Sequence, residues 1–134
     1  MATKLLIILA IIPLLVGVEV QNDPIGKNYK ALVGETCKEM TNGGCMIYTY
    51  RILNFKLDSV VVSYQVIAAC LPKELDNNYT HMYDDLIETY SWSAQNDTIT
   101  INGLDDYGPL TFQNSKLIGE DKFTKRPIEF IEEL

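Results

Sequence analysis

The sequence predicts a small all-β protein, an antiparallel up-and-down β-barrel of about seven or eight strands. Three observations lead to this fold class. Segments rich in β-branched and aromatic residues recur along the chain, and such residues suit a pleated, half-buried surface. Short runs of Asn, Asp, Ser and Gly separate these segments and are typical of tight turns. No convincing long helix interrupts them, and antiparallel chains of this kind close into a barrel or flatten into a sandwich.

The chain begins with a predicted secretory signal peptide, residues 1–20, which leaves a single domain over 21–134. Lys4 supplies a short positive region, and the run 5–18 is apolar apart from one proline and one glycine. This run is shorter than the roughly 20 apolar residues of a membrane-spanning helix. An uncleaved anchor is the alternative, because no clean cleavage motif follows the run. We therefore expect a secreted or periplasmic protein, without a stable membrane span after cleavage.

The charge balance limits the kinds of partner. The formal net charge is −7, and Lys and Arg do not cluster anywhere along the chain. An acidic domain of this kind argues against nucleic acid and against anionic membrane surfaces as partners.

The first strand is expected over 26–33, where Tyr29 supplies an aromatic anchor. Residues 34–44 are interpreted as a loop with a helical turn at 35–40. The run 41–44, Thr-Asn-Gly-Gly, can reverse the chain tightly, because Asn and Gly tolerate positive φ.

The firmest prediction is a β-hairpin over 45–70. Its two strands, 47–55 and 59–69, are dense in β-branched and aromatic residues, and neither contains Gly or Pro. Asp and Ser at 56–59 are suited to the turn between them. Alternation then places one set of side chains on a common face: Leu53, Phe55, Val60, Val62, Tyr64 and Val66.

One residue of this hairpin, Arg51, shares the inner face if the first strand is regular. A buried guanidinium is costly unless it is paired, so such an arginine would meet an anionic group on a ligand. The alternative is a bulge near Ile52 that turns Arg51 to solvent. The alternative is favoured, because exposed arginine is the common case.

The three cysteines, Cys37, Cys45 and Cys70, favour one disulfide in an exported protein. A Cys37–Cys45 bond would close a small loop, and a Cys45–Cys70 bond would join neighbouring ends of the hairpin. The sequence leaves both pairings open, and the remaining cysteine is either buried or pairs between chains. Together with the distant His81, the cysteines match no usual zinc-ligand spacing, so no metal site is expected.

Residues 71–85 form the longest irregular stretch, punctuated by Pro72 and by Asp and Asn. Tyr79, His81 and Tyr83 are large side chains for a solvated loop. They form either a lid over the mouth of a cavity or a set of aromatics that fasten the loop to the barrel rim. The second interpretation is favoured.

A second hairpin is expected from strands 86–94 and 98–101 around a Gln-Asn-Asp turn. Tyr90 and Trp92 share a face with Glu88. That carboxylate would pair with the arginine of the first hairpin if the face is interior, although a solvated carboxylate is the favoured interpretation.

Two short strands, 110–113 and 116–118, are expected after a turn region at 102–109. The tail, 127–134, is interpreted as a short C-terminal helix with Pro127 in its first turn, or as a disordered segment. A last strand is the less favoured alternative, because the apolar residues of the tail alternate poorly.

Several strand patterns recur in one order: L-N-F at 53–55, V-V-V-S-Y at 60–64, Y-S-W at 90–92, T-I-T-I at 98–101, L-T-F at 110–112 and L-I-G at 117–119. This order resembles the small lipocalin-like (calycin-like) β-barrel domains of bacterial envelope and secreted proteins. Lipocalins proper carry Gly-x-Trp on the first strand, whereas Gly26 here precedes Lys27 and Asn28. The resemblance implies a barrel architecture and an extracytoplasmic compartment.

Two functions are compatible with these observations. The first is binding of a small hydrophobic or amphipathic ligand inside the barrel, by Arg51, Phe55, Tyr64, Tyr90 and Trp92. The alternative is an extracellular interaction protein with a filled core and no small-molecule ligand, such as an inhibitor or an envelope-associated partner. The two differ in cavity volume, because a ligand site usually needs about 300 Å³ or more.

An enzyme is not expected, and neither is a cofactor. His81 has no Ser or Cys partner at a recognisable spacing, and no glycine-rich phosphate loop is present in the sequence.

Overall fold

The computed structural model describes residues 23–134, so the predicted signal peptide lies outside the described residues. These residues form a closed barrel of eight antiparallel strands that follow one another in sequence order, which confirms the predicted fold class. None of the helices within 23–134 is long and apolar enough to cross a membrane. The strands are β1 (Asn28–Met40), β2 (Gly43–Phe55), β3 (Ser59–Leu71), β4 (Glu88–Gln95), β5 (Thr98–Asn102), β6 (Leu110–Gln113), β7 (Lys116–Glu120) and β8 (Pro127–Glu133).

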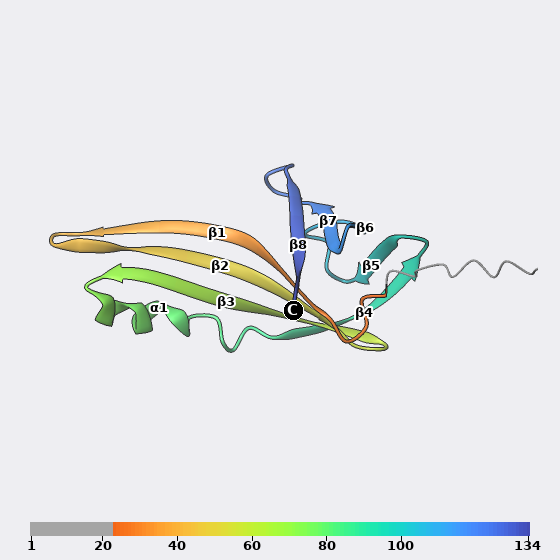
Figure 1. The fold of residues 1–134 in the computed structure, drawn as a ribbon, viewed down its shortest axis with the longest axis horizontal. Helices are drawn as coiled ribbons and strands as arrows, with labels where there is room; N and C mark the ends of the chain where they lie inside the picture. Colours follow the sequence, from red (N-terminus) through yellow and green to blue (C-terminus); the bar gives the residue numbers. More distant parts are fainter. Residues whose placement is uncertain (1–22) are drawn as a thin grey trace, which may run out of the picture.

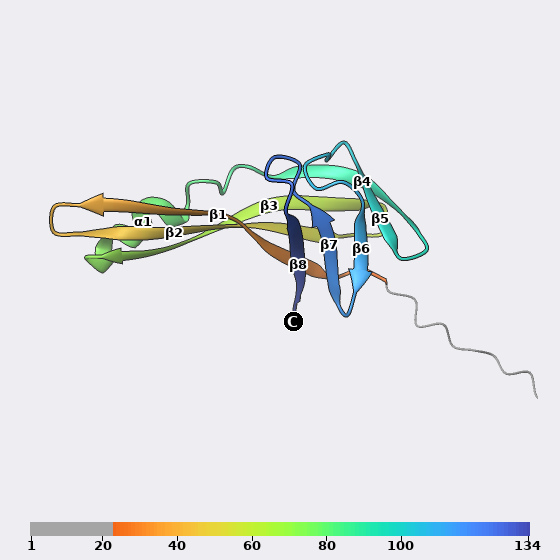
Figure 2. The same ribbon diagram turned by 90° about the horizontal axis from the view of Figure 1, so that it is seen from above.

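The first three strands are much longer than the others and project from the barrel (Figures 1 and 2). β8 pairs with β1 only over 28–30, and β4 pairs with β3 only over 59–62. Beyond those points β1, β2 and β3 continue as a three-stranded sheet. We call this projecting part, residues 34–50 and 63–71, the arm.

The β2–β3 hairpin is confirmed, with a turn at 56–59 in which the Lys56 N–H donates to the Ser59 carbonyl oxygen at 2.7 Å. Its register runs without a break from the pair Phe55 and Val60 to the far end of the arm. A period of two residues therefore sends alternate side chains to one face, and Leu53 and Phe55 are completely buried.

Apolar side chains form a core inside the barrel. The largest completely buried ones are Tyr29, Phe55, Phe130, Leu53, Ile99, Leu110, Leu117, Val60 and Val62. Tyr29 packs edge to face on Phe55 with ring centroids 5.8 Å apart, and Tyr107 packs on Phe130 at 5.2 Å. Such contacts stabilise a core beyond the area that they bury.

A second, smaller core lies on the inner face of the arm. Cys45, Ile47 and Val66 are buried there. They are covered by Leu75, Tyr79 and Tyr83, which follow β3 in and after two short helices, η1 (Lys73–Asp76) and α1 (Asn77–Thr80). The stretch 71–85, expected to be irregular, thus contains two helical turns that pack on the arm.

The predicted loop at 34–44 is wrong, because β1 continues to Met40 and only 41–42 form the turn. Local sequence suggested a helical turn at 35–40. Pairing with β2 along the whole segment overrides that local preference. A β-bulge between Leu32 and Gly34 adjusts the register where β1 leaves the barrel.

The predicted C-terminal helix or disordered tail is also wrong, because the tail forms β8. This strand pairs with β7 over 127–131 and with β1 over 131–133, so it closes the barrel. Ile128 and Phe130 point into the core, while Glu129 and Ile131 are exposed. Two inward residues are a weak periodic signal, and only the two neighbouring strands fix the conformation.

Candidate functional site

Arg51 lies on the inner face of β2 and is only 7 % exposed. The register between β2 and β3 is regular around it, and the bulge lies in β1 instead. The favoured interpretation, a bulge near Ile52 that exposes Arg51, is therefore wrong. The other interpretation, in which a regular strand points Arg51 inward, agrees with the observed side chain.

The guanidinium of Arg51 is held by a loop that lies far away in the sequence. Its Nη1 donates to Asp106 Oδ2 at 2.8 Å and to the Tyr107 hydroxyl oxygen at 3.0 Å. The rings of Tyr64 and Tyr107 flank it, with centroids 4.9 and 5.4 Å from Cζ. Arg51 thus combines an ion pair, a hydrogen bond to a hydroxyl group and two cation–π contacts.

These contacts favour the charged form of Arg51. Burial alone lowers its pKa, but the hydrogen bond to Tyr107 and the nearby Tyr64 and Asp106 raise the pKa above its usual value. For the Tyr107 phenol, burial has the opposite effect and raises the pKa, although the nearby Arg51 charge lowers it in part. The guanidinium Nε is buried and has no hydrogen-bond partner among residues 23–134. The buried Nε–H of the charged group is therefore left without a protein acceptor in the described part of the chain.

The loop between β5 and β6 carries Asp106 and Tyr107 and forms part of the barrel core. Leu104 and Tyr107 are both buried in it. Gly103 and Gly108 flank these residues with φ of +94° and +61°, a region that side chains disfavour. Sequence reasoning identified 102–109 only as a turn region and missed both partners of Arg51. The only signal in the sequence was the pair of glycines, 103 and 108, on either side of the run Leu-Asp-Asp-Tyr at 104–107.

The other predicted ligand residues make separate contacts. Tyr64 contacts Arg51, but Phe55 lies in the barrel core, where Trp92 packs edge to face on it at 5.4 Å. The Trp92 indole N–H donates to the Lys56 carbonyl oxygen at 3.0 Å. Tyr90 is half-buried, and its hydroxyl donates to exposed Glu88. Glu88 thus bonds to Tyr90, and Asp106 is the carboxylate paired with Arg51.

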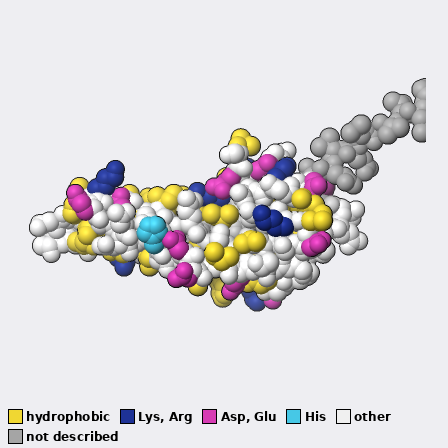
Figure 3. Space-filling model, turned by 90° about the horizontal axis from the view of Figure 1, so that it is seen from below, with side chains coloured by type: hydrophobic (Ala, Val, Ile, Leu, Met, Phe, Trp, Pro, Cys, Tyr) yellow, Lys and Arg dark blue, Asp and Glu magenta, His cyan; other side chains and the backbone are white. Residues whose placement is uncertain are grey.

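The predicted lid residues belong to the segment that covers the arm. Tyr79 and Tyr83 pack against its inner core, and Tyr83 lies 5.6 Å from the Tyr64 ring. His81 is exposed, with Nδ1 2.7 Å from Asp84 Oδ2, on the side of the molecule shown in Figure 3. The two tyrosines thus contact the strands of the arm, whereas the His81 ring bonds to a neighbouring carboxylate.

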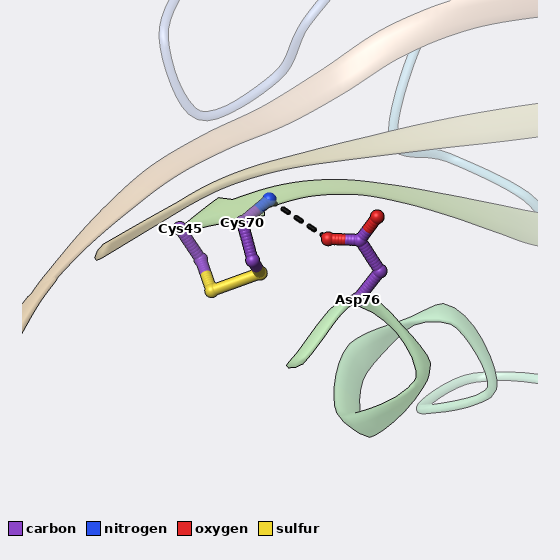
Figure 4. The surroundings of a disulfide bond; sticks show 3 residues. All are labelled: Cys45, Cys70 and Asp76. Atoms are coloured by element: carbon purple, nitrogen blue, oxygen red, sulfur yellow. Dashed lines mark hydrogen bonds between the residues drawn. A yellow bond between two sulfur atoms is a disulfide. The ribbon is translucent and has the colours of Figure 1, made fainter. Parts of the chain in front are cut away.

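The disulfide joins Cys45 and Cys70, one of the two pairings left open by the sequence (Figure 4). It links β2 to β3 near the far end of the arm. Beside it, the backbone N–H of Cys70 donates to Asp76 Oδ1 at 2.8 Å, which fastens η1 to the strand. Cys37 carries a free, exposed thiol on β1. Within 23–134, no group of three or more His, Cys, Asp or Glu side chains is placed to hold a metal ion.

The outer face of the arm is the side opposite the disulfide. Alternation places Met46, Tyr48 and Tyr50 of β2 there, beside Ile67 and Ala69 of β3. No segment within 23–134 packs over this face as η1 and α1 pack over the inner one. Where β1 parts from β8, a cleft of about 430 Å³ adjoins the outer face. The apolar residues on its walls are Leu32, Tyr50, Pro127, Ile128 and Ile131.

No family model, curated protein or solved structure matches this chain. The closed barrel of eight antiparallel strands is compatible with a lipocalin-like architecture.

Proposed function

We propose that this protein is a secreted or periplasmic binding module that engages a protein partner through the outer face of the arm. One contrast carries the proposal. The barrel interior is occupied by its own large side chains, whereas the arm projects with apolar side chains that no described segment covers. In this proposal the barrel is the structural scaffold, and the arm carries the binding surface.

The composition of the outer face supports a protein partner. Ile67 on this face and Leu32 in the adjoining cleft are each more than two-fifths exposed, and Tyr48 and Tyr50 on the face are half-buried. Contiguous exposed apolar surface marks interaction sites on soluble proteins. Tyrosine is enriched at such sites, because it offers a large contact area with little conformational freedom to lose.

The compartment is supported by two independent features. The apolar run after Lys4 is typical of a secretory leader. The Cys45–Cys70 disulfide requires conditions that oxidise thiols, which are found outside the cytoplasm.

Affinity capture from the extracellular fluid or periplasm of the source organism tests the proposal. The bait proteins are the wild type, the double variant Tyr48→Lys/Ile67→Lys, and Leu57→Lys as a matched control. Leu57 is 73 % exposed at the β2–β3 turn, away from the arm, so the control places a lysine elsewhere on the surface. We expect a protein captured by the wild type and by Leu57→Lys but lost from the double variant. Equal capture by all three baits, or none by any, would refute the proposal.

A second candidate function is the binding of a small amphipathic anion at Arg51. The specific observation in its favour is the buried Nε, which has no partner within 23–134 although the guanidinium is charged. A carboxylate bound there would displace Asp106, and its apolar part would take the place of the Tyr107 ring. Native mass spectrometry of the protein purified from its own compartment should then show extra mass that is lost on denaturation and is absent from Arg51→Met. Equal masses for the two proteins would remove this candidate.

A further inference from the structure

The two long edges of the arm differ in how they are protected. On the β3 edge, the N–H of Cys70 is occupied by the Asp76 carboxylate, and η1 and α1 fold back along the strand. On the β1 edge, pairing with β8 ends at Lys30, and no strand within 23–134 pairs with that side of β1 up to Met40. An unpaired strand edge is a template for another strand.

The register shows which backbone groups of β1 are free. Cys45 and Cys70 have Cα atoms 4.1 Å apart, the spacing of a pair that does not exchange hydrogen bonds. The backbone groups of Cys45 therefore point to β1, where Lys38 is its partner. Alternation then directs the N–H and C=O groups of Glu35, Cys37 and Glu39 to the open edge. The Cys70 N–H, which bonds outward to Asp76, agrees with this assignment.

The charges along this edge indicate the chemistry of a strand that would pair with it. Glu35 and Glu39 are exposed, and neither forms an ion pair within 23–134. Lys38 lies on the opposite face, with Nζ 4.9 Å from the centre of the Tyr79 ring. The free charges beside the edge are therefore both negative, on a protein whose net charge is −7.

The base of the edge offers a place for an apolar side chain. The cleft between β1 and β8 opens where the two strands separate, next to the bulge after Leu32. At the rim of the cleft, Glu132 pairs with Lys27 and Glu133 pairs with Lys30, each with a distance of 3.6 Å between Nζ and Oε1. These two pairs make the rim locally neutral. An extended segment on the β1 edge would reach this cleft with one of its side chains.

We propose that the open edge of β1, residues 34–40, binds an extended basic segment of a partner protein by strand addition. Alternate Lys or Arg side chains of the segment lie against Glu35 and Glu39, and an apolar side chain enters the cleft beside Leu32. Main-chain hydrogen bonds supply affinity in this mode, and the flanking side chains supply specificity. The inference rests on the proposed function and names the chemistry of its partner.

A second copy of the chain is a poorer occupant of this edge. A two-fold axis through Cys37 would pair the two β1 edges in an antiparallel manner. Residues related by that axis are Glu35 and Glu39, so each glutamate would lie opposite a glutamate of the other copy. Like charges that face each other across two strands are destabilising.

The test uses a fluorescent peptide of about ten residues, the upper length of most strands, in which Lys alternates with Val and one end carries Leu. Binding is measured by fluorescence anisotropy to Cys37→Ser, to Cys37→Pro and to the wild type. Proline is tolerated on an edge strand, and it removes only an N–H that points to the open edge. We expect Cys37→Ser to bind as the wild type does, and Cys37→Pro to bind about tenfold more weakly, the usual effect of one lost hydrogen bond.

Two matched measurements separate strand addition from simple charge attraction. The variant Glu35→Gln/Glu39→Gln should weaken binding, whereas Glu74→Gln, which removes an exposed carboxylate from η1, should not. Two further peptides carry N-methyl groups, one on the odd-numbered amides and the other on the even-numbered amides. The peptide whose methyl groups point toward β1 should lose binding to the unchanged protein, and the other peptide should still bind. This second measurement holds even where Cys37→Pro fails to fold.

The outcomes distinguish this inference from the proposed function. Equal binding of the methylated and unmethylated peptides would overturn strand addition. If capture of the natural partner still depended on Tyr48 and Ile67, the proposed function would stand without it. Sedimentation could also show that the wild type is a dimer and that Cys37→Pro is a monomer. That result would assign the edge to a second copy of the chain and would also overturn the inference.

Discussion

Arg51 combines a charge, burial and an incomplete set of hydrogen bonds. Its partner Asp106 remains about two-fifths exposed, so the two ends of the ion pair have very different access to water. A charge left in the interior is costly, whereas a charge left at the surface is solvated. The two residues should therefore respond differently when either one is removed.

We expect Asp106→Ala to lower the free energy of unfolding by about 3 kcal/mol, because it leaves the Arg51 charge buried without its anion. Arg51→Met should cost less, about 1–2 kcal/mol, because Asp106 can then be hydrated. Urea unfolding of both variants measures the difference. A larger loss in Arg51→Met would mean that Asp106 contributes little to holding the buried charge.

Tyr29 predicts how stability responds to alkali. Burial in the barrel, with a further contribution from Glu132, raises the pKa of this phenol from 10.0 to about 12. The unfolded chain therefore releases the proton first, and the contribution of Tyr29 to stability is complete below about pH 10 and is lost as pH rises toward 12. Tyr29→Phe should show a shallower decline in melting temperature across that window. Calorimetry in a Cys37→Ser background, which avoids thiol exchange, checks it, and identical slopes would contradict it.

For single residues, the sequence predicted which way a side chain points but not which residues it contacts. Alternation along β2 was sufficient to point Arg51 inward, together with Leu53 and Phe55. The general preference of arginine for solvent then favoured the wrong interpretation. Its true partners, Asp106 and Tyr107, are brought to it by the closure of the barrel, which no local pattern records.

At the scale of elements, Asp76 decides how the β3 edge of the arm is protected. Its carboxylate accepts the Cys70 N–H at 2.8 Å, and its own turn places Leu75 on the inner core. A carboxylate that bonds to a backbone amide is a strong acceptor.

We expect Asp76→Ala to speed hydrogen exchange at the β3 edge of the arm, residues 66–71, by about tenfold, because local opening loses a charge-assisted bond. Glu74→Ala, an exposed neighbour on η1, is the matched control and should leave exchange unchanged. Mass spectrometry after deuterium labelling measures both. Equal exchange in the two variants would mean that the apolar contacts of the covering segment hold this edge by themselves.

Elements were predictable where their own sequence carried the period. The β2–β3 hairpin has long β-branched runs, and its turn and inner face were both predicted correctly. The end of β1 and all of β8 carry weak periods, and they are strands because neighbouring strands supply their hydrogen bonds. The covering segment also depends on the arm, since Leu75, Tyr79 and Tyr83 have nothing to pack on without it.

For the whole molecule, β8 determines whether the barrel closes. Phe130 is completely buried and packs on Tyr107, while its neighbour Ile131 is about half exposed on the same strand. Phe130→Ala should lower the free energy of unfolding by about 3–5 kcal/mol, as is usual for a large aromatic in a core. Ile131→Ala should change it by less than about 0.5 kcal/mol. Denaturant unfolding distinguishes the strand from a disordered tail, for which both changes would be small.

The position of Trp92 has a spectroscopic consequence. It is the only tryptophan in the sequence, and its contacts with Phe55 and Lys56 belong entirely to the barrel. The arm and its covering helices contain tyrosines instead, among them Tyr48, Tyr50 and Tyr79. Indole emission therefore reports melting of the barrel alone, while near-ultraviolet dichroism of the phenols also reports the arm. A titration followed by both signals would resolve, without any attached label, whether the two parts of the molecule unfold together.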